Sequence, residues 1–281
     1  MNPSHYAWTP RDVVECLGAR MVFVPMVEAE DWKPDLDALR RSITDRTKYI
    51  VLSVNNPTGN ALDAKTVKEI VSIAGENDVM ILSDEMYGML AYDRESYPSV
   101  ASVARDVPVI TVNGMSKFFM RTGWRVGYVA FHDPEDRIAE VRHAAKMYNT
   151  LYGHNAARTT PILYAAARAY ASEYQGGFEL LRKIHPLRDY TMKRLNEMDG
   201  ISCVKPRAGF YVFPRVHGIG KTWKTDEEFM TELNKEEALL FCLGEPFGPA
   251  GFGHFRSTFD QDQKITEEAW NRLERFLKRH P

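Results

Sequence analysis

Several side chains that could do chemistry follow three apolar, β-rich runs of the sequence, each at the point where a run ends. They are Asn56 after residues 48–54, Asp84 and Tyr87 after residues 78–83, and Lys117 after residues 107–113. If the runs are neighbouring parallel strands, their carboxyl ends meet at one sheet edge, where α/β proteins bind ligands. The order therefore predicts one polar site that contains an amide, a carboxylate, a phenol and an amine.

Taken one at a time, these residues and a few others also have ordinary structural interpretations. The segment "NNPTGN" (55–60) is typical of a turn, because Asn-Pro and Thr-Gly favour tight backbone geometry. The others could cap a helix (Asp84), pack in a core (Tyr87), face water (Ser116 and Lys117) or lie on a strand (Arg125 and Arg256). Their ordered occurrence in one chain is what favours a functional site.

The elements that must position these residues alternate between strand and helix from about residue 20 to 130. Asp63 is a plausible N-cap for the amphipathic segment 63–77. Strands that recur at roughly thirty-residue intervals with helices between them predict βαβ crossovers and a largely parallel sheet. The predicted strands are 19–27, 48–54, 78–83, 107–113 and 123–131, and the predicted helices are 35–43 and 63–77.

The second half of the chain has a different character and predicts a smaller α+β domain. Residues 134–198 are mostly helical in pattern. They are followed by two short strands within 199–216, a helix (227–238), a strand (239–243), the segment "GHFRSTF" and a last helix (266–279). We expect a large domain over residues 1–155 and a small domain, with its connecting helix, over residues 156–281.

Composition limits the class of protein. The net charge of −2 at pH 7 gives no indication of a nucleic-acid or anionic-membrane partner. No apolar run approaches the ~18–20 residues that span a bilayer, and the N-terminus has no signal-peptide pattern. Cys16, Cys203 and Cys242 are odd in number and far apart, which suits a reducing compartment and predicts neither a disulfide framework nor a metal site. We expect a cytoplasmic, globular protein without a metal.

Read together, the motifs resemble the class I/II aminotransferases, which are pyridoxal-phosphate enzymes of fold type I. They are N-P-T-G (56–59), D-E-x-Y (84–87) and S-K (116–117), with G-W-R-x-G-Y (123–128) behind them. The resemblance runs from about residue 17 to the C-terminus and includes "RAGFYVFP" and "GHFRSTF". It is strongest to alanine and aspartate aminotransferases of archaeal type. It implies an α/β fold: a large domain with a mainly parallel sheet and a smaller α+β C-terminal domain.

The resemblance assigns the cofactor, pyridoxal 5'-phosphate, to the large domain. Lys117 would attach it through a Schiff base and later move a proton at the substrate's α-carbon. Asp84 would pair with the ring nitrogen, which keeps the ring a strong electron sink. Tyr87 and Asn56 would bond the ring oxygen, and Arg125 would bind the phosphate.

The remaining roles concern the substrate, the phosphate and the ring face. The resemblance assigns the substrate's α-carboxylate to Arg256, together with Asn56. Many relatives carry a serine three positions before the lysine that helps to hold the phosphate, and this chain has Gly114 there. We expect either that Ser116, next to the lysine, takes this role or that the phosphate is held more weakly. Tyr6 is our candidate for the aromatic side chain that stacks on the ring.

The chain also begins later than family members do. Their N-terminal segment, with a phosphate-binding loop and the first part of the sheet, has no counterpart in residues 1–20. We expect either a fragment of a longer product or a weakened homologue.

The resemblance implies transfer of the amino group of an alanine- or aspartate-type L-amino acid to a 2-oxo acid such as 2-oxoglutarate. The resemblance implies a homodimer. Two alternatives stay open: a β-lyase of the same fold, and a truncated homologue without activity. They differ in outcome, because a transaminase transfers the amino group, a β-lyase releases ammonia, and the inactive homologue does neither.

Overall fold

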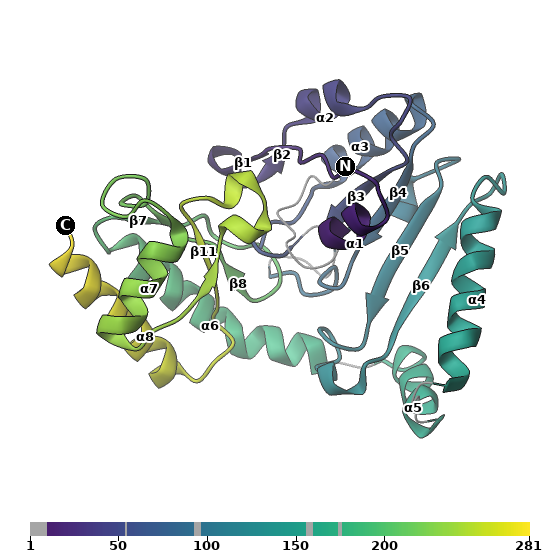
Figure 1. Ribbon diagram of the computed structural model, residues 1–281. Helices are drawn as coiled ribbons and strands as arrows, with labels where there is room; N and C mark the ends of the chain where they lie inside the picture. Colours follow the sequence, from purple (N-terminus) through teal and green to yellow (C-terminus); the bar gives the residue numbers. More distant parts are fainter. Residues whose placement is uncertain (1–9, 54, 93–96, 156–159, 174–175) are drawn as a thin grey trace.

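The computed structural model describes residues 10–53, 55–92, 97–155, 160–173 and 176–281. Its first part is built on a four-stranded sheet (Figure 1). The strands, in their spatial order, are β3 (Tyr49–Ser53), β4 (Met80–Asp84), β5 (Val109–Gly114) and β6 (Gly127–His132).

The sheet is mainly parallel, as predicted. β3, β4 and β5 run parallel, and β6 runs antiparallel to β5. The three parallel strands are rich in Val, Ile and Leu, and Ile50, Ile81 and Val109 are completely buried. Such side chains suit a sheet that is covered by other elements.

Helices α2 (Leu36–Ser42) and α3 (Ala64–Glu76) pack near one another beside β3 and β4 (Figure 1). The predicted N-cap is confirmed, because the Asp63 carboxylate accepts a hydrogen bond from the Thr66 N–H at 2.8 Å. Ile70 and Ile73 of α3 join the sheet's buried residues in one apolar core. This core supports the strands from which the candidate site residues project.

The predicted strand at 19–27 is wrong in extent. Within it the structure has one bridge residue, Phe23, and the two-residue strand β1 (Met26–Val27). β1 pairs antiparallel with β2 (Lys33–Pro34). Pro25 has no N–H to donate to a ladder, and Asp31 and Trp32 reverse the chain with positive φ angles of 56° and 59°.

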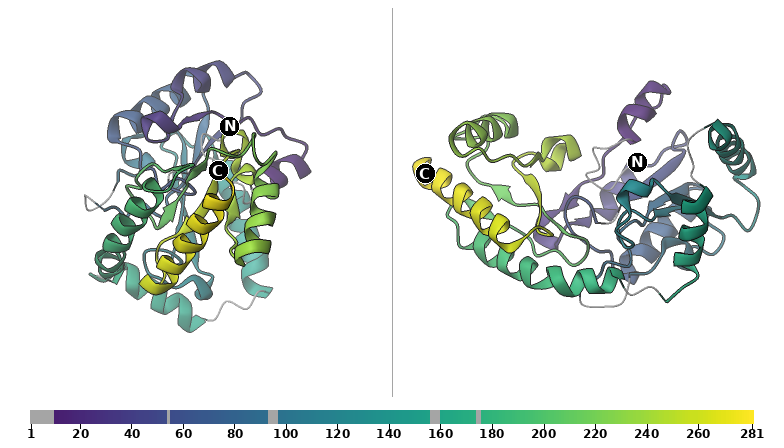
Figure 2. Two further views of the ribbon diagram at one scale, coloured as in Figure 1. Left: turned by 90° about the vertical axis from the view of Figure 1, so that its left-hand side faces the viewer. Right: turned by 90° about the horizontal axis from the view of Figure 1, so that it is seen from below.

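The helical pattern at 134–198 is confirmed by three helices. α4 (Ala139–Asn155) and α5 (Thr160–Tyr170) lie on the side of β6, and α6 (Gly176–Asn196) runs along one side of the molecule to the second part (Figure 2). A short helix, α1 (Pro10–Cys16), precedes the first part. In the part of the chain that the structure describes, none of the helices has the length and apolarity to cross a membrane.

The second part is an antiparallel sheet covered by helices. Its strand order is β10–β11–β8, so "GHFRSTF" supplies the middle strand and not an edge strand. Trp223, Phe229, Trp270 and Phe276 form the aromatic centre of its core. The elements are β8 (Tyr211–Val212), α7 (Asp226–Glu237), β10 (Cys242–Leu243), β11 (Phe255–Thr258) and α8 (Gln263–Arg279), with a separate pair of β7 (Ile201–Ser202) and β9 (Arg215–Val216).

Close packing of the backbone explains why residue 114 is a glycine. Gly114 pairs with Gly127 across β5 and β6, and a Cβ at position 114 would lie 2.9 Å from the Val126 carbonyl oxygen and 3.0 Å from the Gly127 Cα. Backbone atoms cannot move aside as the end of a flexible side chain can. The serine of many relatives therefore does not fit this backbone.

We expect Gly114→Ser to lower the free energy of unfolding by about 1–3 kcal/mol, because it overpacks the β5–β6 contact. Gly123→Ser is the matched control, since a Cβ at Gly123 meets nothing within 4 Å, and it should change stability by less than about 0.5 kcal/mol. Urea unfolding followed by circular dichroism measures both. Equal losses in the two variants would contradict the packing argument.

Candidate active site

The carboxyl ends of the three parallel strands lie level with one another. Ser53 pairs with Asp84, and Asp84 pairs with Val112, so the chain leaves all three strands at the same sheet edge. The structure brings Asn56, Asp84, Tyr87 and Lys117 to this edge as the sequence predicts. Asp84 is the last residue of β4, and the other three come from the segments that follow β3, β4 and β5.

Lys117 projects from a tight loop after β5. The loop is closed by a backbone hydrogen bond from the Arg121 N–H to the Met115 carbonyl (2.9 Å), and the buried rings of Phe118 and Phe119 anchor it. Within the described residues, the Lys117 ammonium takes part in no ion pair. Its Nζ lies 5.4 Å from the centre of the Tyr87 ring and 5.4 Å from that of Phe210. The loop thus holds an amine against aromatic surface.

Asp84 is a carboxylate in a largely desolvated place. Burial raises its pKa above the usual value, and the neighbouring Glu85 carboxylate adds to this shift. The Met86 N–H, which donates to Asp84 at 3.1 Å, and the charge of Lys117 act in the opposite direction. Among the described residues, no cationic side chain forms an ion pair with Asp84. The environment therefore suits a carboxylate that pairs with a cationic ligand group.

Tyr87 is buried and contacts the second part of the chain. Its hydroxyl donates a hydrogen bond to the Tyr211 hydroxyl at 3.0 Å. Gly209 makes this approach possible, since its φ is +69° and an added Cβ would lie 3.3 Å from the Tyr87 ring. The "RAGFY" segment is thus in contact with the sheet edge.

Arg256 reaches the same edge from β11. Its Nη1 donates to the side-chain oxygen of the buried Asn56 at 2.9 Å, and its Nη2 lies 3.3 Å from the Cys242 sulfur. The guanidinium carbon lies 4.6 Å from the centre of the Tyr211 ring and 5.0 Å from that of Phe247. A planar cation held in this way has the fork geometry that binds a carboxylate.

The remaining predicted residues are not joined to this cluster. Arg125 is exposed at a positive φ of 51°, and its Nη1 donates to the Thr122 carbonyl at 3.0 Å. Ser116 is half-buried, and its carbonyl accepts a hydrogen bond from the Thr122 hydroxyl at 2.9 Å. Within the described residues these two contact their own loop and not Asp84 or Tyr87. Tyr6 lies outside the described residues.

Sequence reasoning missed four residues that surround Arg256 and Lys117. They are aromatic or thiol side chains, and a motif with one key residue gives no sign of such neighbours. The only signal was the quoted segment "RAGFYVFP", which contains two of them. The four are Phe210, Tyr211, Cys242 and Phe247.

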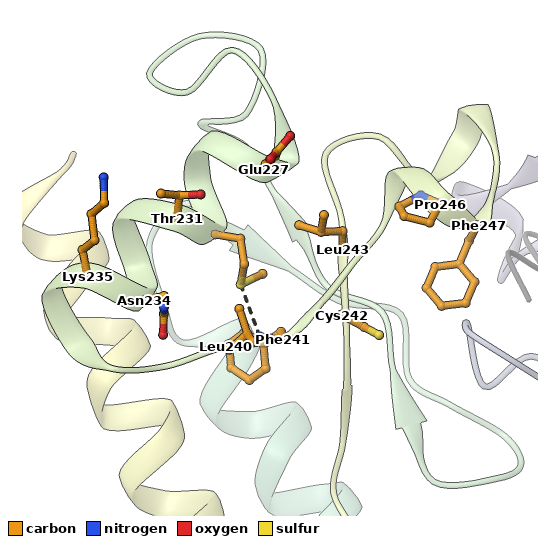
Figure 3. A pocket seen from close by; sticks show the side chains of 11 residues that line it. Glu227, Thr231, Asn234, Lys235, Leu240, Phe241, Cys242, Leu243, Pro246 and Phe247 are labelled. Atoms are coloured by element: carbon orange, nitrogen blue, oxygen red, sulfur yellow. Dashed lines mark hydrogen bonds between the residues drawn. The ribbon is translucent and has the colours of Figure 1, made fainter.

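An apolar groove of about 540 Å³ lies between helix α7 and the segment 240–247 (Figure 3). Met230, Leu243 and Phe247 are among its lining residues. Cys242 and Phe247 contact Arg256 as well, so the groove and the candidate site share part of one wall.

The side chains at the edge fit pyridoxal phosphate. An amine without an ion pair in the described residues and a carboxylate whose charge is disfavoured by burial lie beside a phenol and an amide. Such a set matches an aldehyde, a protonated ring nitrogen and a ring oxygen in one ligand. Together with the mainly parallel sheet, this set of side chains fits an enzyme of fold type I.

Comparison with known proteins agrees with this class. Residues 3–273 match the family described as aminotransferase class I and II. The chain is 35% identical to aromatic-amino-acid aminotransferase 2 of Thermococcus litoralis and 35% identical to the aspartate aminotransferase of Pyrococcus abyssi, in each case over 99% of this chain and 69% of the relative. Alanine aminotransferase from Pyrococcus furiosus superposes with a TM-score of 0.88 at 42% identity, over 95% of this chain and 67% of that one.

The chain therefore belongs to the class I and II aminotransferases. This confirms the family resemblance, the fold class and the aminotransferase class of enzyme.

The raised pKa of Asp84 predicts how stability depends on pH in the protein without ligand. A raised pKa means that the folded state holds the proton more tightly than the unfolded chain, so this group lowers stability as the pH rises through its folded-state pKa. We expect Asp84→Asn to melt at a higher temperature than wild type at pH 7. The gap should close as the pH falls towards 3.8, the ordinary pKa of the group.

Asp63→Asn is the control, because helix-capping hydrogen bonds lower the pKa of Asp63 and reverse the sign. Scanning calorimetry between pH 4 and pH 8 makes the comparison. A stabilising effect of Asp63→Asn as large as that of Asp84→Asn would show that the effect does not come from burial of Asp84.

Proposed function

We propose that this aminotransferase binds pyridoxal 5'-phosphate and moves the amino group of an alanine- or aspartate-type L-amino acid to a 2-oxo acid such as 2-oxoglutarate. The observation that carries the proposal is the juxtaposition of Lys117, Asp84 and Arg256 at one sheet edge. The names of the similar proteins, which include alanine and aspartate aminotransferases, support this substrate class. All three side chains belong to the part of the chain that the structure describes.

Each part of the cofactor has a proposed partner. Asp84 bonds the protonated ring nitrogen, where the carboxylate gains the cation that its burial requires. Tyr87 and Asn56 bond the ring oxygen, and Arg125 and Ser116 bind the phosphate. When bound, the cofactor supplies an aldehyde that reacts with amines and a ring that accepts electrons.

The protein's own groups orient the substrate and move its proton. Arg256 binds the α-carboxylate through its guanidinium fork, and the contact of this guanidinium with Asn56 fixes its direction. Lys117 Nζ moves the proton of the substrate's α-carbon, and the surrounding rings of Tyr87 and Phe210 limit access of water to it. We also propose a domain division near residue 155, with the small domain bringing Arg256 to the site.

Visible absorbance after addition of pyridoxal phosphate tests the role of Lys117. We expect a yellow band in the wild type and in the control Lys65→Ala, whose side chain is 87% exposed, and no band in Lys117→Ala. L-Alanine or L-aspartate should bleach the band in the wild type.

Product analysis then separates the candidate reactions. Transfer of the amino group to 2-oxoglutarate supports the proposal, whereas release of ammonia and a 2-oxo acid would indicate a β-lyase. A folded wild type without a band would leave only a non-catalytic homologue.

We further propose that the protein is a homodimer through the exposed surfaces of β6, α4 and α5. These elements carry large apolar side chains at high exposure, among them Val129 (49%), Met147 (46%) and Tyr164 (76%). Apolar surface of this kind on neighbouring elements is typical of an interface.

We expect Val129→Lys combined with Tyr164→Glu to weaken dimerisation at least about tenfold, because each change buries a charge. Ile265→Glu on α8, at a side chain that is 60% exposed, is the control and should leave the dimer intact. Sedimentation equilibrium over a range of protein concentrations measures the dissociation constant of the dimer. A monomeric wild type, or equal weakening by the control, would refute the interface.

A further inference from the structure

Tyr211 contacts both Tyr87 and Arg256 in the candidate site. It is 7% exposed and lies on β8, which pairs with the strand that carries Arg256. Its hydroxyl accepts the hydrogen bond of Tyr87 at 3.0 Å, and its ring centre lies 4.6 Å from the Arg256 guanidinium carbon. One side chain thus spans the two groups proposed for the cofactor's ring oxygen and the substrate's carboxylate.

We propose that Tyr211 is a positioning residue that couples the phenol of Tyr87 to the guanidinium of Arg256. This inference rests on the proposed function, because it assigns roles to two residues of that site. Tyr211 itself contacts neither reacting atom in the proposed mechanism. It acts through its hydroxyl on one partner and through its ring face on the other.

The hydroxyl acts on the strength of Tyr87 as a donor. A hydroxyl can both donate and accept, so when Tyr87 donates to another acceptor, Tyr211 can donate to the Tyr87 oxygen. A donor at that oxygen stabilises the phenolate form and makes the Tyr87 O–H more acidic. Hydrogen bonds in such a chain strengthen one another.

The ring acts on the direction of Arg256. The face of an aromatic ring attracts a guanidinium, and the contact counts for more when water is excluded. The Tyr211 ring is buried, and Asn56 holds one end of the same guanidinium. The ring therefore limits the tilt of the fork, whereas the hydroxyl has no part in this contact.

The two effects are separable by substitution. Tyr211→Phe removes the hydroxyl and keeps the ring, and Tyr211→Leu removes both. Tyr92→Phe is the matched control, because Tyr92 is a partly buried tyrosine whose hydroxyl bonds the "RAGFY" segment, donating to the Gly209 carbonyl at 2.6 Å. The substitution removes a comparable hydrogen bond, and this bond is made to neither Tyr87 nor Arg256.

The hydroxyl effect is measured on the protein without cofactor, so its outcome does not depend on the proposed function. Tyrosine labelled with carbon-13 at Cζ reports each phenol in an NMR pH titration, with Tyr87→Phe assigning the signal. We expect Tyr211→Phe to raise the pKa of Tyr87 by roughly half a unit or more, and Tyr92→Phe to leave it unchanged. If Tyr211→Phe left the pKa of Tyr87 unchanged, or if Tyr92→Phe shifted that pKa equally, the coupling would be overturned.

The ring effect is measured with the cofactor-loaded protein. Tyr211→Phe should change the KM for the amino acid by less than about twofold, and Tyr211→Leu should raise it at least about fivefold. Equal KM values for Tyr211→Phe and Tyr211→Leu would overturn the role of the ring. If wild type has no activity while the apoprotein titration succeeds, the proposed function fails and the hydroxyl coupling stands.

Discussion

The parallel hydrogen-bonded register of β3, β4 and β5 is the constraint on which the candidate site depends. Parallel pairing places Ser53, Asp84 and Val112 at one level, so the segments that follow them leave the sheet together. A slip of one residue would turn Asp84 to the opposite face of the sheet. The buried Val and Ile side chains oppose such a slip, and they therefore also keep Asp84 on the face of the sheet where the candidate site lies.

The Lys117 amine lies against aromatic rings, whose faces attract a cation. The Asp84 carboxylate, in contrast, is largely desolvated, and it costs stability when the protein is without ligand. Perturbed groups of this kind are common at functional sites, because a ligand of complementary charge removes the cost when it binds. The buried Asp84 carboxylate thus lowers folding stability and favours the binding of a cationic ligand group.

Contacts across the two parts of the chain complete the arrangement. Asn56 and Tyr87 come from the sheet, whereas Arg256 and Tyr211 come from β11 and β8, and two hydrogen bonds join the pairs. The second part therefore acts on the site directly as well as covering it. Arg256 also connects the site to the apolar groove, because it contacts Cys242 and Phe247, which line that groove.

By itself, the sequence determined the helices, the mainly parallel character of the sheet and the edge at which Asn56, Asp84, Tyr87 and Lys117 meet, because hydrophobic period and strand-end chemistry are local properties. It did not determine the fate of residues 19–27, where Pro25 and the reversal at Asp31 outweighed a β-rich composition. Only the tertiary structure brought Tyr211, Cys242 and Phe247 to Arg256. The physical reason is that contacts between distant segments depend on side-chain packing between the two parts, which has no periodic signature in the chain.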